Sequence, residues 1–445
     1  MKTPICDFVR RYAESGALRL HMPGHKGAGS LGEALDITEI QGADSLYEAS
    51  GIIRESEENA SALFGCATFY STEGSSQCIR AMLHLAALHA RRTGRKPRIA
   101  AARNVHKTFL SAVALLDLEV DWLYPEQQDS YLSCCIDPAA LEARLSAADE
   151  KPTAVYLTSP DYLGNLADVA AVSAVCRRHG VLLLVDNAHG AYLRFLEPSL
   201  HPVDLGADLC CDSAHKTLPV LTGGAYLHIS DRAPALCRDQ AKNALALFGS
   251  TSPSYLILQS LDRANAYLAD GYREKLAAFL PGAAALKDRL ARAGWTILGE
   301  EPLKITAAPK SRGYRGHELA DLLLEQDIVC EFADPDFLVL MLTPELTEAE
   351  LLRLESVLNS LPARPAIAEV PPAIAPGQTV LSVREATLTP WETVPAEQAL
   401  DRVLGAPSVG CPPAVPILVC GERIDAQALR SFRYYGIRTC TVTKE

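Results

Sequence analysis

The sequence predicts an α/β protein whose large domain is built on a mostly parallel sheet, followed by a smaller α+β domain. From Pro97 onward, short apolar runs alternate with amphipathic segments, as strands alternate with helices. The run Val181–Val185 is apolar throughout and favours a strand covered on both faces. Ligand groups collect at the carboxyl ends of such strands. Four polar residues follow expected strands and are predicted to converge there: His106, Ser159, Asp186 and Lys216.

The elements of the large domain follow in chain order. A helix at 54–65 ends at Gly65, and the strand Ala67–Thr72 leads through Glu73–Ser76 into a second helix. Further strands are expected at Ile99–Ala102, Val120–Tyr124, Ala154–Thr158, Val181–Val185, Leu209–Cys211 and Gly223–Ile229. Helices are expected at Asn104–Leu116, Leu141–Ala148 and Val169–His179, and in parts of Ala241–Ala269, with a break at Phe248–Tyr255.

The remaining sequence predicts an α+β domain, a linker and a tail. The α+β domain is expected to contain helices Glu274–Ala293, His317–Gln326 and Thr347–Ser360 and strands near Trp295–Leu298, Leu303–Thr306, Ile328–Phe332 and Phe337–Leu342. A Pro- and Ala-rich linker separates it from a tail with a helix at Pro395–Leu404. We therefore expect five segments: 1–50, 51–270 as the large domain, 271–361 as the small domain, 362–378 as the linker and 379–445 as the tail.

Composition narrows the class of protein. The chain has 445 residues, of which 48% are apolar, and a formal net charge of −12 with scattered basic residues, so nucleic acid is not an expected partner. Its thirteen cysteines have no metal-ligand spacing, which predicts no metal and favours free thiols in a reducing cytoplasm. Neither a signal peptide nor an apolar run long enough to span a membrane is visible.

The stretch Ala207–Gly224 organises the candidate site. A short apolar run, Leu209–Cys211, predicts a buried strand, and Lys216 lies between it and a turn rich in Pro and Gly. A lysine amine becomes nucleophilic when desolvation or a neighbouring cation lowers its pKa. Ser213 and His215 flank the lysine and could donate to an anion such as a phosphate. Taken alone, the same pattern is also typical of an ordinary surface loop.

A second motif predicts an anion cradle. Gly74, Ser75 and Ser76 lie between an expected strand and a helix start, where free N–H groups and the helix dipole favour an anion. Capping of the helix by Ser75 is an alternative reading, compatible with the first.

Together these residues fit a pyridoxal 5′-phosphate site. The cofactor needs three partners. They are a lysine amine that condenses with its aldehyde, a cradle for its phosphate, and an acidic side chain beside its ring nitrogen. Asp186, 30 residues before Lys216, would keep that nitrogen protonated because a carboxylate favours a nearby cation. His106 would be a flat group able to stack on the ring and to move protons.

The sequence also resembles the Orn/Lys/Arg decarboxylase family, in the short form without an N-terminal wing domain. The resemblance runs from about residue 18 to about 425 and rests on several motifs: Leu20–Gly27, Arg103–Lys107, Ser213–Pro219, Ser250–Tyr255 and Arg384–Ala386. It implies the fold type I, aspartate-aminotransferase-like architecture, pyridoxal phosphate as cofactor, and a homodimer or higher homo-oligomer. It also implies that the segment 1–50 lines the active site.

Roles for single residues follow from the same resemblance. It implies that Lys216 carries the cofactor, that Asp186 pairs with the pyridine nitrogen and that His106 stacks on the ring. It implies that Thr251 reaches the phosphate from the partner subunit. The remaining expected cofactor contacts are Gly74, Ser75, Ser76, Ser159, Ala188, His189, Ser213 and His215.

Departures from the family pattern concern the substrate more than the cofactor. The family usually has Asn at Glu73, Thr at Asp161 and Glu at Asn187. The tail stretch Gly410–Pro416 matches its family counterpart only loosely. Because Glu73 and Asp161 add carboxylates, we expect them to favour a cationic substrate side chain, although either can be a plain loop carboxylate. Arg312, Arg315 and Arg384 are the candidates for gripping the substrate carboxylate, as an arginine of the small domain does in aminotransferases of this fold.

The sequence thus favours an enzyme that decarboxylates lysine, arginine or ornithine. Its product would be a diamine or polyamine. Two alternatives stay open. One is another reaction on the same cofactor, such as transamination or elimination. The other is a catalytically silent relative that binds the cofactor or a partner protein as a regulator, which the intact Asp186 and Lys216 disfavour.

Overall fold

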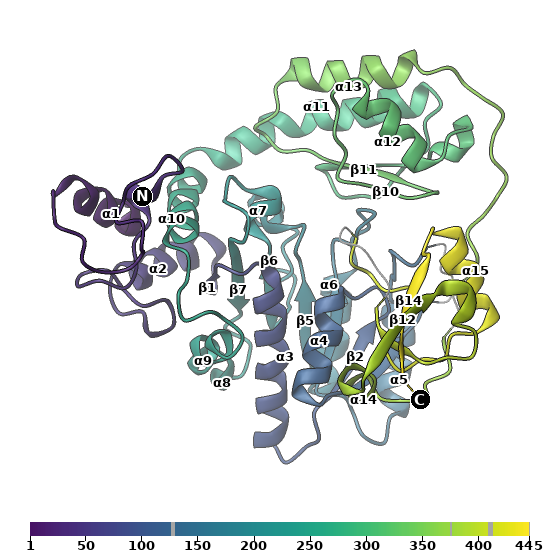
Figure 1. Cartoon of the computed structure of the whole chain (residues 1–445), viewed down its shortest axis with the longest axis horizontal. Helices are drawn as coiled ribbons and strands as arrows, with labels where there is room; N and C mark the ends of the chain where they lie inside the picture. Colours follow the sequence, from purple (N-terminus) through teal and green to yellow (C-terminus); the bar gives the residue numbers. More distant parts are fainter. Residues whose placement is uncertain (126–129, 374–375, 408–412, 445) are drawn as a thin grey trace. The chain divides into compact units, whose positions relative to one another are not determined.

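A seven-stranded sheet is the largest sheet of the computed structural model, which describes residues 1–125, 130–373, 376–407 and 413–444 (Figure 1). Its strand order is β1-β7-β6-β5-β4-β2-β3. The strands are β1 Ala67–Ser71, β2 Arg98–Ala102, β3 Glu119–Leu123, β4 Ala154–Thr158, β5 Leu182–Asp186, β6 Leu209–Asp212 and β7 Ala225–Ile229. Every strand expected for the large domain is present, within two residues of its predicted bounds.

The register of this sheet brings three strand ends together. β4, β5 and β6 run parallel, whereas β7 is antiparallel to both β6 and β1. All five residues of β5 are buried, as expected for a strand covered on both faces. Asp186, the last residue of β5, pairs with Thr158 on β4 and with Cys211 on β6. The carboxyl ends of these strands therefore surround Asp186.

The chain divides into two compact units. The first comprises Met1–Ile99, Glu142–Ser159 and Asp168–Leu276, and the second comprises Ala100–Leu141, Pro160–Ala167 and Ala277–Glu445. Two helices, α5 Pro138–Ala147 and α11 Tyr272–Arg292, contain residues of both units.

Capping residues mark the ends of helices in the first unit. These helices are α1 Pro4–Glu14, α2 Ile52–Phe64, α3 Ser75–Arg92, α6 Val169–His179, α7 Ala214–Thr217, α8 Ala235–Asp239, α9 Ala241–Ala246 and α10 Tyr255–Ala269. The Asp168 carboxylate caps α6 by accepting from the Ala171 N–H at 2.9 Å, and Gly180 ends it in the left-handed conformation. The sequence analysis missed α1, α7 and α8.

The second unit contains two antiparallel sheets. One has the order β10-β11-β9-β8 and the other β12-β14-β13. Their strands are β8 Ile297–Leu298, β9 Lys304–Ala307, β10 Phe332–Ala333, β11 Leu338–Met341, β12 Trp391–Pro395, β13 Leu404–Ala406 and β14 Thr439–Thr443. The helices are α4 Lys107–Leu116, α12 Gly316–Leu324, α13 Glu348–Ser360, α14 Val383–Leu388 and α15 Ala426–Tyr434. Among all described helices, none combines the length and apolar character needed to cross a membrane.

The helix predicted at Pro395–Leu404 is wrong. Its residues form the end of β12, a single 3₁₀ turn at Ala396–Gln398 and the start of β13. β12 pairs with β14, so that Trp391 lies opposite Thr443, far away in the sequence. A local pattern of apolar residues does not reveal a strand whose partner is so distant.

Other boundaries also differ from expectation. The helix expected from Asn104 begins at Lys107, because the His106 ring caps it by accepting from the Thr108 N–H. The strand expected at Ile328–Phe332 is reduced to Phe332–Ala333. Of the tail stretch Gly410–Pro416, the first three residues lie outside the described part of the chain.

Candidate active site

Lys216 lies in α7, the short helix that follows β6 in the first unit. Its Nζ is 3.0 Å from Nε2 of His189, which is buried in the loop after β5. The lysine is half-buried and not extended into solvent. An amine held at a strand end against an imidazole is positioned for covalent chemistry and for proton exchange with that ring.

Asp186 is the buried acid of the same unit and is only 2% exposed. Its carboxylate accepts from the Tyr156 hydroxyl at 3.2 Å and from the Ala188 N–H at 3.2 Å, and the Cys211 thiol lies at 3.6 Å. Burial raises the pKa of Asp186, and the charge of Lys216 lowers it only in part. Such a carboxylate is suited to a cationic partner, as a protonated pyridine nitrogen is.

The predicted cradle lies at the start of α3. Ser213 Oγ donates to Ser75 Oγ at 2.8 Å, so hydroxyls from two separate segments meet beside the first turn of this long helix. Gly74 has φ of +70°, and a Cβ there would come within 4.0 Å of His215 Cε1 and of the Ser76 nitrogen. The positive φ favours glycine at this point, and no atom crowds the space beside the first turn of α3. These donors and this space fit a phosphate group.

Ser75 has a different local role from the one considered in the sequence. Gly74, not Ser75, is the N-cap of α3, and Ser75 is the first helical residue. The Ser75 side chain is therefore turned to Ser213 instead of capping the helix. Ser159, at the end of β4, is 3% exposed, and its N–H donates to the Asp186 carbonyl at 3.0 Å.

Glu73 connects the cradle to the Ser250–Tyr255 segment. This exposed side chain accepts from the Ser250 N–H, and Thr251 follows as an exposed residue of the same segment. The carboxylate of Glu73 thus has a structural contact, in addition to the substrate contact predicted for it.

Three predicted residues belong to the second unit, and each has contacts there. His106 caps α4, with its Nδ1 2.9 Å from Thr108 Oγ1. Asp161 is 3% exposed and accepts from the N–H groups of Leu163 and Asn165, both at 2.9 Å. The Arg384 guanidinium donates to the Ala114 carbonyl at 2.6 Å, near the end of α4. The roles predicted for these residues at the cofactor or substrate stay predictions.

The sequence analysis missed a buried hydrogen-bonded network at the end of β6. Asp212, the last residue of β6, accepts at Oδ2 from Nε2 of His201 at 3.1 Å and from Nε2 of His228 at 3.0 Å. All three side chains are fully buried. Burial alone would raise the pKa of the Asp212 carboxyl, but the two imidazoles outweigh it and hold the pKa well below its usual range.

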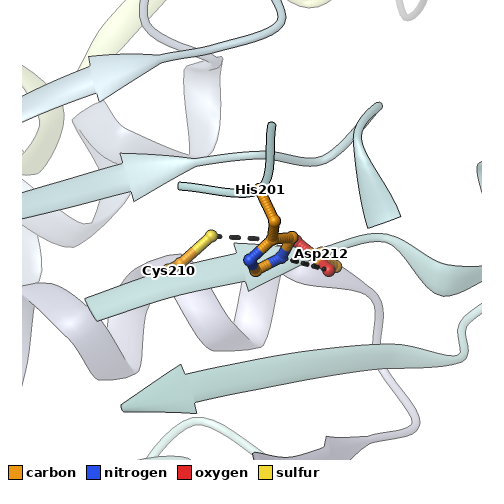
Figure 2. Close-up of side chains that lie close together, drawn as sticks. All are labelled: His201, Cys210 and Asp212. Carbon is orange, nitrogen blue, oxygen red and sulfur yellow. Dashed lines mark hydrogen bonds and ion pairs between the residues drawn. The ribbon is translucent and has the colours of Figure 1, made fainter. Parts of the chain in front are cut away.

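Figure 2 shows Asp212 of this network with two of its neighbours, His201 and Cys210. His201 and Cys210 both turn toward Asp212, and their donor atoms lie within 4.8 Å of one another. These contacts are hydrogen bonds, with the Cys210 thiol 3.7 Å from Asp212 Oδ1. Because Asp212 directly precedes Ser213, the network fixes the strand end from which the Ser213–Lys216 stretch begins.

Asn187 joins the network and explains one departure from the family pattern. Its Nδ2 donates to Asp212 Oδ1 at 2.7 Å, and the residue is fully buried. A glutamate at this position would place a second carboxylate against Asp212 in a low-dielectric interior. An amide at 187 is therefore the appropriate partner for an aspartate at 212, and it ties the residue after Asp186 to β6.

Asn187→Glu is expected to lower the free energy of unfolding by about 3 kcal/mol, because it buries an unpaired carboxylate beside Asp212. Urea unfolding of the variants measures this effect. The same substitution introduced into an Asp212→Asn background is expected to cost at least about 1 kcal/mol less, since the repelling charge is gone. Equal costs in the two backgrounds would show that residues 187 and 212 are not coupled.

Comparison with known proteins assigns the family. The model of the Orn/Lys/Arg decarboxylase major domain matches residues 3–309. The chain belongs to the Orn/Lys/Arg decarboxylase family. An uncharacterized protein of Bacillus subtilis (strain 168), YaaO, is 31% identical over 97% of this chain and 93% of its own length. The arginine decarboxylase of the same strain is 28% identical over 95% of this chain and 91% of its own length.

Solved structures show the fold. Lysine decarboxylase A from Pseudomonas aeruginosa superposes with a TM-score of 0.80 at 17% identity, covering 99% of this chain and 80% of that protein. Its architecture and that of further neighbours is fold type I of the enzymes that depend on pyridoxal phosphate, as the sequence predicted. This Orn/Lys/Arg decarboxylase family member is thus a decarboxylase with pyridoxal 5′-phosphate as its cofactor.

Proposed function

We propose that this decarboxylase acts on a basic amino acid, namely arginine, lysine or ornithine, and releases the corresponding amine for polyamine synthesis. The observation that carries the proposal is the placement, within one unit, of Lys216 after β6 and of the buried Asp186 at the end of β5, where the charge of Lys216 lowers the pKa of Asp186. Relatives that match nearly the whole chain are arginine decarboxylases, which supports a basic substrate.

The proposed roles follow from the contacts already described. Bound pyridoxal phosphate supplies an electron-withdrawing ring that accepts the electrons left behind when carbon dioxide departs. Lys216 holds the cofactor, and Asp186 keeps a proton on the ring nitrogen. Ser75, Ser213 and His215 orient the phosphate, with further contacts from Gly74, Ser76, Ser159 and Ala188.

Proton movement is assigned to side chains around the lysine. Nζ of Lys216 and Nε2 of His189 are 3.0 Å apart, within the range of direct proton transfer. We assign the return of a proton to the substrate carbon to Lys216, with His189 as the neighbour that exchanges protons with it. His106 is assigned to stack on the ring.

Release of carbon dioxide from a panel of amino acids tests this function. Arginine, lysine and ornithine are expected to include the best substrate, while glutamate, aspartate and leucine release no carbon dioxide above background. Amino transfer to an added oxoacid without carbon dioxide would instead support an aminotransferase. Cofactor binding without turnover of any substrate would support the silent regulator.

Glu73 is proposed to select for the cationic end of the substrate. Glu73→Gln removes the charge but keeps an oxygen that can accept from the Ser250 N–H, so the local structure is preserved. We expect kcat/KM for the basic substrate to fall by about three- to tenfold. Glu58→Gln, which removes an exposed carboxylate of α2, is the matched control. Unchanged kcat/KM in Glu73→Gln would exclude this role.

We propose a homodimer with shared active sites, in which Thr251 reaches the partner subunit's phosphate. The N-terminal segment supports an interface, because Leu18, Leu20 and Leu31 are each more than 80% exposed. It is also the segment expected to line the site. We further propose a cytoplasmic location, supported by the absence of disulfides among the described cysteines.

Mixing two inactive variants tests the shared sites. Lys216→Ala and Thr251→Ala chains, unfolded and refolded together in equal amounts, are expected to recover about a quarter of the wild-type activity, because half of the dimers are mixed and each has one whole site. Lys216→Ala mixed with Asp186→Asn is the control, since both residues belong to one subunit's site and no activity returns. Equal recovery in the two mixtures, or none in the first, would refute the arrangement.

A further inference from the structure

The second unit contains a cavity of about 370 Å³ that the proposed chemistry does not use. Its lining comes from β10 and the turn that follows it, from the start of α12, from the end of α15 and from two loop segments. Most of the lining is aromatic or aliphatic: Tyr131, Phe332, Val415, Tyr434, Tyr435 and Ile437. A cavity of this size accommodates a small organic molecule, and its few polar groups decide which one.

Asp334 is the acidic group of this lining and is 7% exposed. Its Oδ1 accepts from the N–H groups of Asp336 and Phe337, both at 2.7 Å, which fixes the carboxylate in the turn. Oδ2 is buried and has no hydrogen-bond partner among the described residues. Burial, together with the charge of Asp336, raises the pKa of Asp334 to about 7. The charge of Lys310, which pairs with Asp336, lowers this pKa only in part, so the cavity presents a carboxylate without an ion-pair partner of its own among the described residues.

Aromatic rings surround the same space. The Tyr131 and Tyr435 centroids are 4.8 Å apart in an edge-to-face arrangement, and those of Tyr434 and Tyr435 are 4.9 Å apart. Burial and the charges of Asp334 and Asp336 raise the pKa values of Tyr131 and Tyr435, so both rings stay neutral. Aromatic faces around one carboxylate form the type of site that binds organic cations.

The lining also disfavours a ligand that carries a carboxylate in addition to its cationic group. Its described residues include no lysine or arginine, and His317 is their one basic side chain. Lys310 lies outside the lining and pairs with Asp336 at 2.6 Å and with the Tyr434 hydroxyl. An amino acid would bring a carboxylate for which the cavity has no strong cationic partner, whereas an amine without a carboxylate would not.

We propose that this cavity binds an alkylammonium cation without a carboxylate, with its charged end at Asp334 and its chain against the tyrosine rings. Amines of this class are what decarboxylation of a basic amino acid releases, so we infer that the cavity of the second unit is a product-binding site. Only this identification as product rests on the proposed function. Recognition of the cation rests on the cavity itself.

Binding is measured by calorimetry on the holoenzyme after borohydride reduction, because the reduced cofactor no longer reacts with amines. Agmatine, cadaverine and tetramethylammonium are the probes, and arginine and lysine are the comparisons. We expect agmatine and cadaverine to bind at least about tenfold more tightly than arginine and lysine, respectively, and tetramethylammonium to bind as well. Asp334→Asn is expected to weaken amine binding at least about tenfold, because it keeps the turn but removes the charge. Glu331→Gln, an acid of the same unit outside the lining, changes affinity less than about twofold.

A second pair of variants tests the rings independently if Asp334→Asn does not fold. Tyr435→Phe retains the ring and removes a hydroxyl that has no partner among the described residues, so amine binding is preserved. Tyr435→Leu removes the ring and weakens tetramethylammonium binding at least about threefold. Equal affinities in Asp334→Asn and the parent, amino acids binding as tightly as amines, or no binding by the parent would overturn the proposal. Because turnover is not measured, a failed decarboxylation assay leaves these outcomes unaffected.

Discussion

Asp186→Asn is expected to lower kcat by about a hundredfold or more while cofactor affinity changes less than about tenfold. The phosphate contacts remain. The ring nitrogen, however, loses its anionic partner, so the ring accepts the electrons left by the departing carbon dioxide less readily. Steady-state rates together with cofactor titration by absorbance separate the two effects. Asp168→Asn is the control, because Asp168 is a carboxylate of the same unit that caps α6, and asparagine caps equally well.

The outcome for Asp186→Asn distinguishes its proposed role from a structural one. A merely structural carboxylate would lower the unfolding midpoint and cofactor affinity together with the rate. Near wild-type turnover in a variant that binds cofactor would refute the assignment of Asp186.

Lys216→Ala is expected to lower the rate of carbon dioxide release by about a thousandfold or more, because it removes both the cofactor linkage and the proposed proton donor. The cofactor would still bind through the cradle, with the absorbance of the free aldehyde. An added small amine such as methylamine is expected to restore part of the rate. Lys275→Ala, which removes an exposed lysine of α11, is the control and leaves the rate unchanged.

Much of the sheet and of the lysine–aspartate pair could be predicted because their signals are local. β4, β5 and β6 are apolar runs, and the residue that ends β5 is the acid singled out from the sequence. Polar residues directly after such runs lie at one sheet edge by the topology of parallel strands.

The network around Asp212 could not be predicted because it depends on register and on packing. Asp212 meets His228 across the antiparallel β6–β7 pair and His201 from a loop, and neither contact has a sequence spacing of its own. The β12 strand was missed for the same reason, since its partner β14 lies more than forty residues later. Asn187 was visible as a departure, but its partner Asp212 was not.

Borohydride reduction of the purified holoenzyme, followed by peptide mass mapping, is the most direct test that Lys216 carries the cofactor. The account predicts a yellow protein that loses its visible absorbance on reduction, with a single phosphopyridoxyl group attached to Lys216. A label on another lysine, or a protein that stays colourless with excess cofactor, would contradict it.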